Sequence, residues 1–171
     1  MEAMKNLLER RSIRKYKDTQ VPDDLLDQVL EAGLYAPTGM NRQNVVMVAV
    51  RDKETRDKLS KMNAAVMGAQ NDPFYGAPCV IVVLGDAETY PVVENGSLVL
   101  GNLMNAAHAL GLGSCWIHRA KQTFETEEGK ELLRAWGLKD TLVGVGNCIL
   151  GYPDEEPAAR PRLDGRIVKI G

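Results

Sequence analysis

The stretch Val93–Leu110 reads VENGSLVLGNLMNAAHAL and is apolar on nearly every side of the helix that it predicts. Glycine, alanine and asparagine recur along it, as in a helix that other elements enclose. A helix at the surface of a globular protein instead keeps one broad polar face toward solvent. We therefore expect Val93–Leu110 to form the central helix of the fold.

Strands and further helices are predicted on both sides of this helix. Apolar, β-branched runs indicate buried strands, and apolar residues at helical spacing indicate helices. The expected strands are 45–50, 79–84, 114–117, 143–150 and, near the end of the chain, 166–170. The expected helices are a short one around Met4–Leu8, one from Pro22 to a stop before Pro37, one over 53–67, and one that opens near Thr126. Strands mixed with long helices are typical of a layered α/β or α+β domain.

The chain shows no repeat and no internal linker, so we expect one domain over residues 1–171. The segment Gly151–Gly165 is different, because it carries three prolines and no apolar periodicity. A loop of this length is usually functional or disordered. Since a strand-like tail follows it, we expect the segment to be held at both ends, for example across a partner subunit.

Composition excludes several classes of protein. The chain has 171 residues, of which 44% are hydrophobic, with 21 basic and 23 acidic side chains and a formal charge of −2. Such a chain buries a core without disulfides or a structural metal, which excludes disordered proteins and miniproteins. No apolar run is long enough to span a membrane, and Met1–Lys5 lacks a secretory start, so we expect a cytoplasmic protein without membrane association. A net charge near zero argues against nucleic-acid binding.

Cysteines and histidines give little support for a metal or thiol centre. Cys79, Cys115 and Cys148 each lie in an apolar run and form no C-x-x-C pair, so we expect buried, reduced thiols. His108 lies within the expected central helix, where a packed or hydrogen-bonded side chain is the simplest interpretation. His118 is the other histidine, and two histidines without a carboxylate pattern do not predict a zinc or iron site.

Two arginine clusters lie near the ends of the chain. The first comprises Arg10, Arg11, Ser12 and Arg14. Like charges at i, i+4 on a helix repel, so this cluster is better explained by an anion that binds between its members, although a solvated basic face is the alternative. In the second, Arg160-Pro161-Arg162, alternation in an extended backbone directs both guanidiniums the same way, which suits a phosphate. A mobile charged loop is the alternative there.

A polar loop, Ala36–Gln43, separates the expected second helix from the first strand and reads APTGMNRQ. Loops at such junctions often hold ligands. Thr38, Asn41 and Gln43 supply uncharged donors and acceptors, and Gly39 allows close approach of the backbone. A flat heterocycle with polar edges needs these groups. An ordinary turn would explain the proline and glycine of this loop but not its polar residues.

Five segments, in this order, resemble the FMN-dependent nitroreductase family: RRSIRKY (10–16), APTGMNRQ (36–43), LGLGSCWI (110–117), VGVGNCILGYP (143–153) and ARPR (159–162). Each is weak singly, but their order and spacing over the whole chain make the joint signal specific. The resemblance implies a three-layer α/β/α fold of the α+β class, with a central mixed, mainly antiparallel sheet of four to five strands surrounded by helices. It also implies a homodimer with FMN at the subunit interface, across which the C-terminal segment reaches.

The resemblance also implies roles for individual residues. Arg10, Ser12, Arg160 and Arg162 resemble a phosphate clamp, Arg14 resembles the cation near the flavin pyrimidine edge, and Arg11 would contact the ribityl chain. Pro37, Thr38, Gly39 and Asn41, with Gln43 in the same loop, would reach the ring from the opposite subunit. Asn63 resembles an asparagine that reads the pyrimidine edge, and Trp116, His118 and Arg119 would lie beside the reactive face.

The implied reaction is a ping-pong transfer. NADH or NADPH delivers hydride to N5 of the flavin and leaves, and an electron-poor acceptor such as a nitro compound or a quinone then takes electrons in the same cleft. No side-chain acid or nucleophile is required. The chain departs from the family pattern at Asn44-Val45, where many members have proline and an aromatic residue, and at His118-Arg119, where relatives often have a small residue.

Three alternatives remain open at this point. Other flavin chemistry of the same superfamily, such as reductive dehalogenation or flavin destruction, would use the same cofactor. An FMN storage or sensor module would keep the phosphate clamp without turnover. Nucleic-acid binding through the basic N-terminus is disfavoured, because aromatic residues are not interleaved with the arginines.

Overall fold

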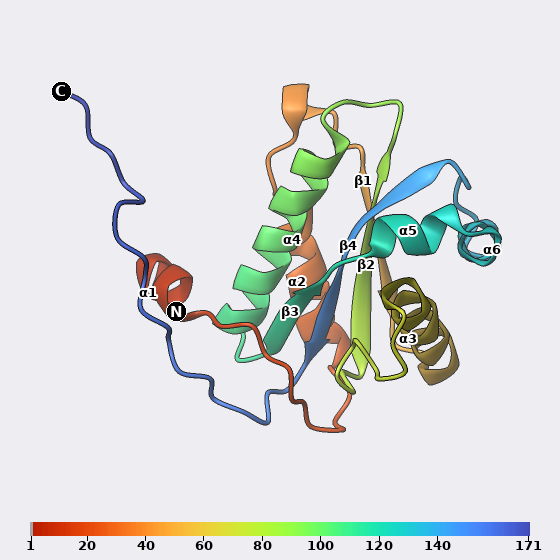
Figure 1. Cartoon of the computed structure of the whole chain (residues 1–171), viewed down its shortest axis with the longest axis horizontal. Coiled ribbons are helices and arrows are strands. Elements are labelled where there is room, and N and C mark those ends of the chain that lie inside the picture. Colours follow the sequence, from red (N-terminus) through yellow and green to blue (C-terminus); the bar gives the residue numbers. More distant parts are fainter. Residues whose placement is uncertain (1) are drawn as a thin grey trace.

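A single antiparallel sheet organises the structure, a computed structural model that describes residues 2–171. Its strands follow the order β1-β2-β4-β3, with β1 at Val45–Val50, β2 at Cys79–Asp86, β3 at Gly113–Ile117 and β4 at Leu142–Gly151. The helices are α1 (Ala3–Glu9), α2 (Asp23–Leu34), α3 (Lys53–Met67), α4 (Val92–Ala109), α5 (Ala120–Glu125) and α6 (Glu127–Ala135), with a 3-10 turn η1 (Gly39–Asn41). Figure 1 shows these helices arranged on both faces of the sheet.

The alternation of side chains along β2 builds a core on each face of the sheet, as a strand buried on both sides requires. Val80, Val82 and Leu84 belong to the core that includes Leu59 of α3, Phe124 of α5 and Leu133 of α6. Cys79, Ile81 and Val83 belong to the core that includes Val29 of α2 with Leu100 and Leu103 of α4. The fold therefore has three layers, as the resemblance implied.

The helix α4 confirms the predicted central helix on its inner side and differs on its outer side. Gly96 lets it approach β4 closely, since a Cβ there would lie 2.6 Å from a methyl group of Val145. On the outer side, however, Val93 and Leu98 are 54% and 48% exposed. An apolar helix that is bare on one side within a single chain is typical of a surface that another molecule covers.

Four of the five expected strands and all the expected helices form. The expected strand at 166–170 is wrong, because residues 158–171 are exposed and have no regular structure, with no sheet edge beside them to pair with.

The helix α5 was not predicted. The helix α1 forms as expected, and its apolar residues Met4, Leu7 and Leu8 are 59%, 58% and 66% exposed in the single chain. Among the described residues, no helix is both long and apolar enough to cross a membrane.

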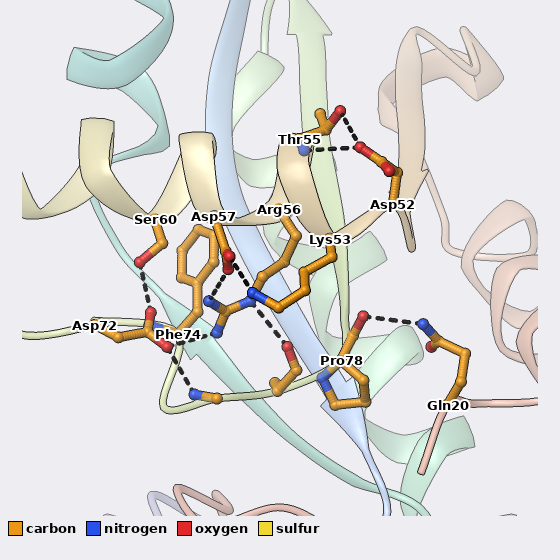
Figure 2. Close-up of polar contacts among 12 residues, drawn as sticks. Gln20, Asp52, Lys53, Thr55, Arg56, Asp57, Ser60, Asp72, Phe74 and Pro78 are labelled. Carbon is orange, nitrogen blue, oxygen red and sulfur yellow. Dashed lines mark hydrogen bonds and ion pairs between the residues drawn. The ribbon is translucent and has the colours of Figure 1, made fainter. Parts of the chain in front are cut away.

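A buried ion-pair network fixes the loop that leads into β2 (Figure 2). The guanidinium of Arg56, on α3, donates to Asp72 at 2.6 Å, to Asp57 at 2.9 Å and to the carbonyl of Ala77 at 3.0 Å. It also lies over the ring of Phe74, 5.6 Å from the ring centre. Every nitrogen of this guanidinium has an acceptor, as a buried charge requires.

Candidate functional site

The two ends of the chain run side by side at one edge of the sheet. The backbone N–H of Ile13 donates to the carbonyl of Ser114 on β3 at 3.0 Å. The N–H of Lys17 donates to Tyr152 and that of Asp154 to Lys15, both at 2.9 Å. The N-terminal segment is therefore held between β3 and the segment that follows β4, and the only parallel pairing in the described chain is the bridge of Ser12 with Ser114.

A cavity of about 550 Å³ opens where these segments meet the end of α4. Its volume lies in the range of small-molecule sites. Its lining includes Arg11, His108, Ser114 and Pro157, so both chain ends contribute to it. Glu9, Glu155 and Glu156 line it as well, and charges of both signs therefore face this space.

Arg10 and Arg11 use their guanidiniums differently. Nη1 of Arg11 donates to the carbonyls of Leu8 and Arg10 at 2.8 Å each, which caps the end of α1. Nη1 of Arg10 is buried and has no partner within residues 2–171. A buried cationic nitrogen without an acceptor is costly, so it indicates a place where an anion binds.

His108 lies beside this arginine and is satisfied by the protein, as the sequence predicted. Its Nδ1 lies 2.7 Å from Oδ1 of Asn6, whose amide nitrogen donates to the carbonyl of Asn105 at 3.0 Å. Burial, and then the charge of Arg10, lower the pKa of His108. A neutral imidazole adds no further charge to the arginine cluster.

The remaining arginines of the two clusters are exposed. The backbone N–H of Arg14 donates to the carboxylate of Glu155, and the residue itself is exposed. Arg160 and Arg162 follow Pro157 by three and five residues and form no hydrogen bond or ion pair with the described part of the chain. The structure thus brings the two segments together at the cavity, but it does not bring the second pair of guanidiniums into contact with the first.

The polar loop after α2 has a defined and unusual shape. Met40, Asn41 and Gln43 have φ of 54°, 52° and 50°, in the left-handed region. The N–H of Gln43 donates to Oγ1 of Thr38 at 3.0 Å, and its side-chain amide donates to Asn41 at 3.1 Å. Non-glycine residues seldom adopt this conformation in succession, and such strain is typical of ligand sites. Pro37, at the start of the loop, is exposed.

The polar loop lies at the opposite end of α4 from the arginines. Asn95, near the start of α4, accepts a hydrogen bond from Gly39, whereas His108, near its end, contacts α1 through Asn6. At 1.5 Å per residue these two positions are about 20 Å apart along the helix axis. One chain therefore does not bring its own polar loop to its own arginine cluster.

Buried side chains hold the tip of β3. The carbonyls of Ile117, His118 and Arg119 accept hydrogen bonds of 3.4, 2.8 and 2.9 Å. The donors are Asn147, Asn63 and Thr123, respectively, all of them buried. The expected site residue Asn63 is therefore engaged with this tip.

Trp116 and His118, which precede and follow the end of β3, face different surroundings. The indole of Trp116 packs on Gly146, and its Nε1, like Nη1 of Arg10 and Nε of Arg51, is a buried donor without a partner in residues 2–171. The side chain of His118 is exposed. This end of the sheet therefore offers one unpaired donor and one accessible imidazole.

The three thiols confirm the expectation of buried, unpaired cysteines. Burial raises the pKa of Cys79 to about 12 and raises that of Cys148 as well. Thiols of this kind are protonated at neutral pH and are poor nucleophiles.

Several positioning residues were missed by the sequence analysis. Asn95, Asn147 and Thr123 carry no charge and were not expected as site residues, but each is 2% exposed and bonds a backbone group of the polar loop or of the tip of β3. Asn147 had a usable signal, since it interrupts an apolar run, and a buried amide must have partners.

Comparisons with known proteins identify the family of this chain. The model of the nitroreductase family matches residues 7–70 and 64–152. A protein of Thermus thermophilus named NADH dehydrogenase is 40% identical, over 88% of this chain and 67% of its own length. A protein of Bacillus subtilis named FMN reductase [NAD(P)H] is 28% identical, over 98% of this chain and 72% of its own length. The crystal structure of a nitroreductase with bound FMN from Bacteroides fragilis superposes with a TM-score of 0.90 at 25% identity, and the match covers 100% of both chains.

Proposed function

Because this chain belongs to the nitroreductase family, we propose that it binds FMN between two copies of itself and transfers electrons from NADH or NADPH to an electron-poor acceptor. A nitro compound or a quinone is the expected kind of acceptor. The whole chain, residues 1–171, acts as one FMN-binding domain. We place it in the cytoplasm, where its three unpaired cysteines stay reduced.

The observation that carries this proposal is the buried, unpaired Nη1 of Arg10. A phosphate held by Arg10 and Ser12 supplies the anionic oxygens that this nitrogen lacks. The unpaired Nε1 of Trp116 is a second donor that needs an acceptor. FMN carries both a phosphate and a ring system with acceptor edges, so the residues present fit this group.

The length of α4 supports the proposal of a homodimer. The polar loop and the arginine cluster lie at opposite ends of this helix, about 20 Å apart, and in the proposed dimer the loop and the cluster that share one FMN come from different chains. The exposed apolar residues supply an interface. They include Met4, Leu7 and Leu8 of α1, Val93 and Leu98 of α4, and Leu163, Ile167, Val168 and Ile170 of the C-terminal segment. So much exposed apolar surface is typical of a protein–protein interface.

In this dimer each predicted residue has a task. Arg10, Ser12, Arg160 and Arg162 bind the phosphate, Arg11 lies beside the ribityl chain, and Arg14 supplies positive charge at the pyrimidine edge. Thr38, Gly39, Asn41 and Gln43, led by Pro37, contact the ring from the second chain. Trp116, His118 and Arg119 line the reactive face, with Asn63 holding the last two in place.

The protein contributes position and charge to the reaction. Bound FMN supplies two-electron transfer between a nicotinamide and an acceptor. Reductant and acceptor occupy the same cleft in turn, which gives ping-pong kinetics. The fixed tip of β3 orients each of them, and Arg14 stabilises negative charge at the pyrimidine edge.

A simple experiment tests the proposed function. The protein is purified without added cofactor, its visible spectrum is recorded, and it is titrated anaerobically with NADH and with NADPH. We expect a yellow protein that a nicotinamide bleaches and that a nitro compound or quinone restores. A protein that stays colourless after incubation with FMN contradicts the proposal. A yellow protein that neither nicotinamide bleaches identifies a storage or sensor module instead.

A further inference from the structure

Arg119 has a backbone conformation that arginine seldom adopts. Its φ of 75° and ψ of 8° lie in the left-handed region, where glycine is the usual residue. The surroundings hold it there, because Asn63 bonds the preceding carbonyl and Thr123 bonds the carbonyl of Arg119 through both its N–H and its hydroxyl. A strained residue that its neighbours fix so firmly indicates a functional position.

The side chain of Arg119 is fixed at one end and free at the other. Its Nε donates to Oδ1 of Asn63 at 3.1 Å, and Asn63 is fully buried. Within residues 2–171 neither Nη group donates a hydrogen bond, and no carboxylate pairs with this guanidinium. The hydrogen bond to Asn63 orients the guanidinium, while its two Nη groups stay available to a ligand.

Two other arginines, unlike Arg119, have their guanidiniums paired with carboxylates. Arg56 is buried with every nitrogen paired, as Figure 2 shows, and Arg134 bonds both Glu127 and Asp140. These side chains hold parts of the fold together. Arg119 forms no ion pair with the described chain, so fold stability does not account for its charge.

We infer that Arg119 is a specificity-determining residue that binds an anionic group of the substrate. The inference rests on the proposed function, which places the tip of β3 beside the reacting groups. A guanidinium fork binds carboxylates and phosphates through two parallel hydrogen bonds. The anionic group is therefore a carboxylate on an aromatic acceptor or the extra phosphate that distinguishes NADPH from NADH.

The test uses the FMN-loaded dimer and Arg119→Gly. Glycine suits the left-handed backbone, so this variant is expected to fold, which its melting temperature checks. Arg119→Lys keeps the positive charge but loses the two parallel guanidinium donors and the hydrogen bond to Asn63. Lys121→Gln is the matched control, since it removes a nearby exposed charge that pairs with Glu125 at 2.6 Å.

Two ratios of kcat/KM are measured, one for 4-nitrobenzoate over its neutral analogue 4-nitrobenzamide and one for NADPH over NADH. We expect Arg119→Gly to lower one ratio about 10-fold or more, Arg119→Lys to recover part of it, and Lys121→Gln to leave both unchanged. A fall in the first ratio places the anionic group on the acceptor, and a fall in the second places it on the reductant. Ratios within about two-fold of wild type overturn the inference.

Binding without turnover separates this inference from the proposed function. Calorimetric titration with benzoate and with 2′-AMP reports the two anionic groups directly. We expect Arg119→Gly to weaken one of them by about the same factor as the kinetic ratio. A wild-type protein without nicotinamide activity contradicts the proposed function, whereas equal binding of both ligands to wild type and Arg119→Gly contradicts the role of Arg119.

Discussion

The side-chain oxygen of Asn95 accepts a hydrogen bond of 2.9 Å from the backbone N–H of Gly39. The same amide donates to the side chain of Asn44 at 2.9 Å, so one buried asparagine of α4 holds both the polar loop and the residue that follows it. The loop contains three non-glycine residues with positive φ. Its shape therefore depends on α4 as well as on its own sequence.

Replacement of Asn95 should weaken FMN binding more than it weakens the fold. In Asn95→Ala the N–H of Gly39 loses its acceptor, at a cost of about 1–3 kcal/mol, and the polar loop relaxes. We expect FMN to bind roughly 10-fold or more weakly, as measured by fluorescence titration of the apoprotein. Asn102→Ala is the control, because Asn102 lies on the same helix and bonds the carbonyl of Ala32 at 2.9 Å. Equal FMN affinity in both variants would falsify the link between Asn95 and the site.

The second arginine cluster should be needed for the cofactor but not for folding. Arg160 and Arg162 are exposed and unpaired within the described chain, so their removal leaves the core intact. Each charge-assisted phosphate contact contributes about 1.5–3 kcal/mol. We expect Arg160→Ala/Arg162→Ala to be folded and colourless, with an unchanged circular dichroism spectrum. Lys169→Ala, in the same segment, should stay yellow; a yellow double variant removes the clamp assignment.

Acid should destabilise the protein partly through Asp72 (Figure 2). Burial alone raises the pKa of Asp72, but hydrogen bonds from Ser60, Arg56 and two backbone N–H groups outweigh it and hold the pKa below the usual 3.8. The stabilisation is therefore complete above the usual pKa and is lost as the pH falls through the lowered one. We expect the free energy of unfolding in urea to fall below about pH 4, and less steeply in Asp72→Asn. Parallel curves for the two proteins would show that Asp72 does not contribute.

The exposed apolar residues of the C-terminal segment should stabilise the dimer. Ile167 and Ile170 are 81% and 97% exposed in one chain. If a second chain buries them, Ile167→Ser/Ile170→Ser loses about 2 kcal/mol or more of association free energy per chain. Sedimentation at several concentrations measures the shift toward monomer. Arg166→Ala, which changes the residue directly before Ile167, serves as the polar control. A double variant that dimerises with the same constant as wild type contradicts this role of Ile167 and Ile170.

The sequence predicted those elements whose apolar pattern is set by burial in the core. The β-branched runs at β1, β2 and β4 predict their strands because burial on both faces of the sheet leaves a continuous apolar pattern, and the apolar Val93–Leu110 predicts a helix whose inner side is buried. It was misleading for 166–170. That segment has the β-branched composition of a strand, but a strand forms only with a partner, and residues 166–170 pair with none in the described chain.

The site was predictable in its charged residues and not in their supports. Arginines attract notice in a sequence, whereas Asn95, which fixes the polar loop, is recognised only once its burial is known. Asn63 was found through the family resemblance and proves to hold the backbone of His118 and the side chain of Arg119. The separation of the polar loop from the arginines is set by the length of α4 in space, which no local motif reports.

The central claim is that each FMN site takes its arginines from one chain and its polar loop from another. Complementation tests it most directly. One chain carries Arg160→Ala/Arg162→Ala and a second, with a different tag, carries Thr38→Ala/Asn41→Ala; each alone should be colourless. Co-expressed heterodimers selected through both tags have one site with both halves intact, so we predict about one FMN per heterodimer. Colourless heterodimers, when both variants are folded and paired, would mean that Arg160 and Arg162 come from the same chain as the polar loop, which contradicts the claim.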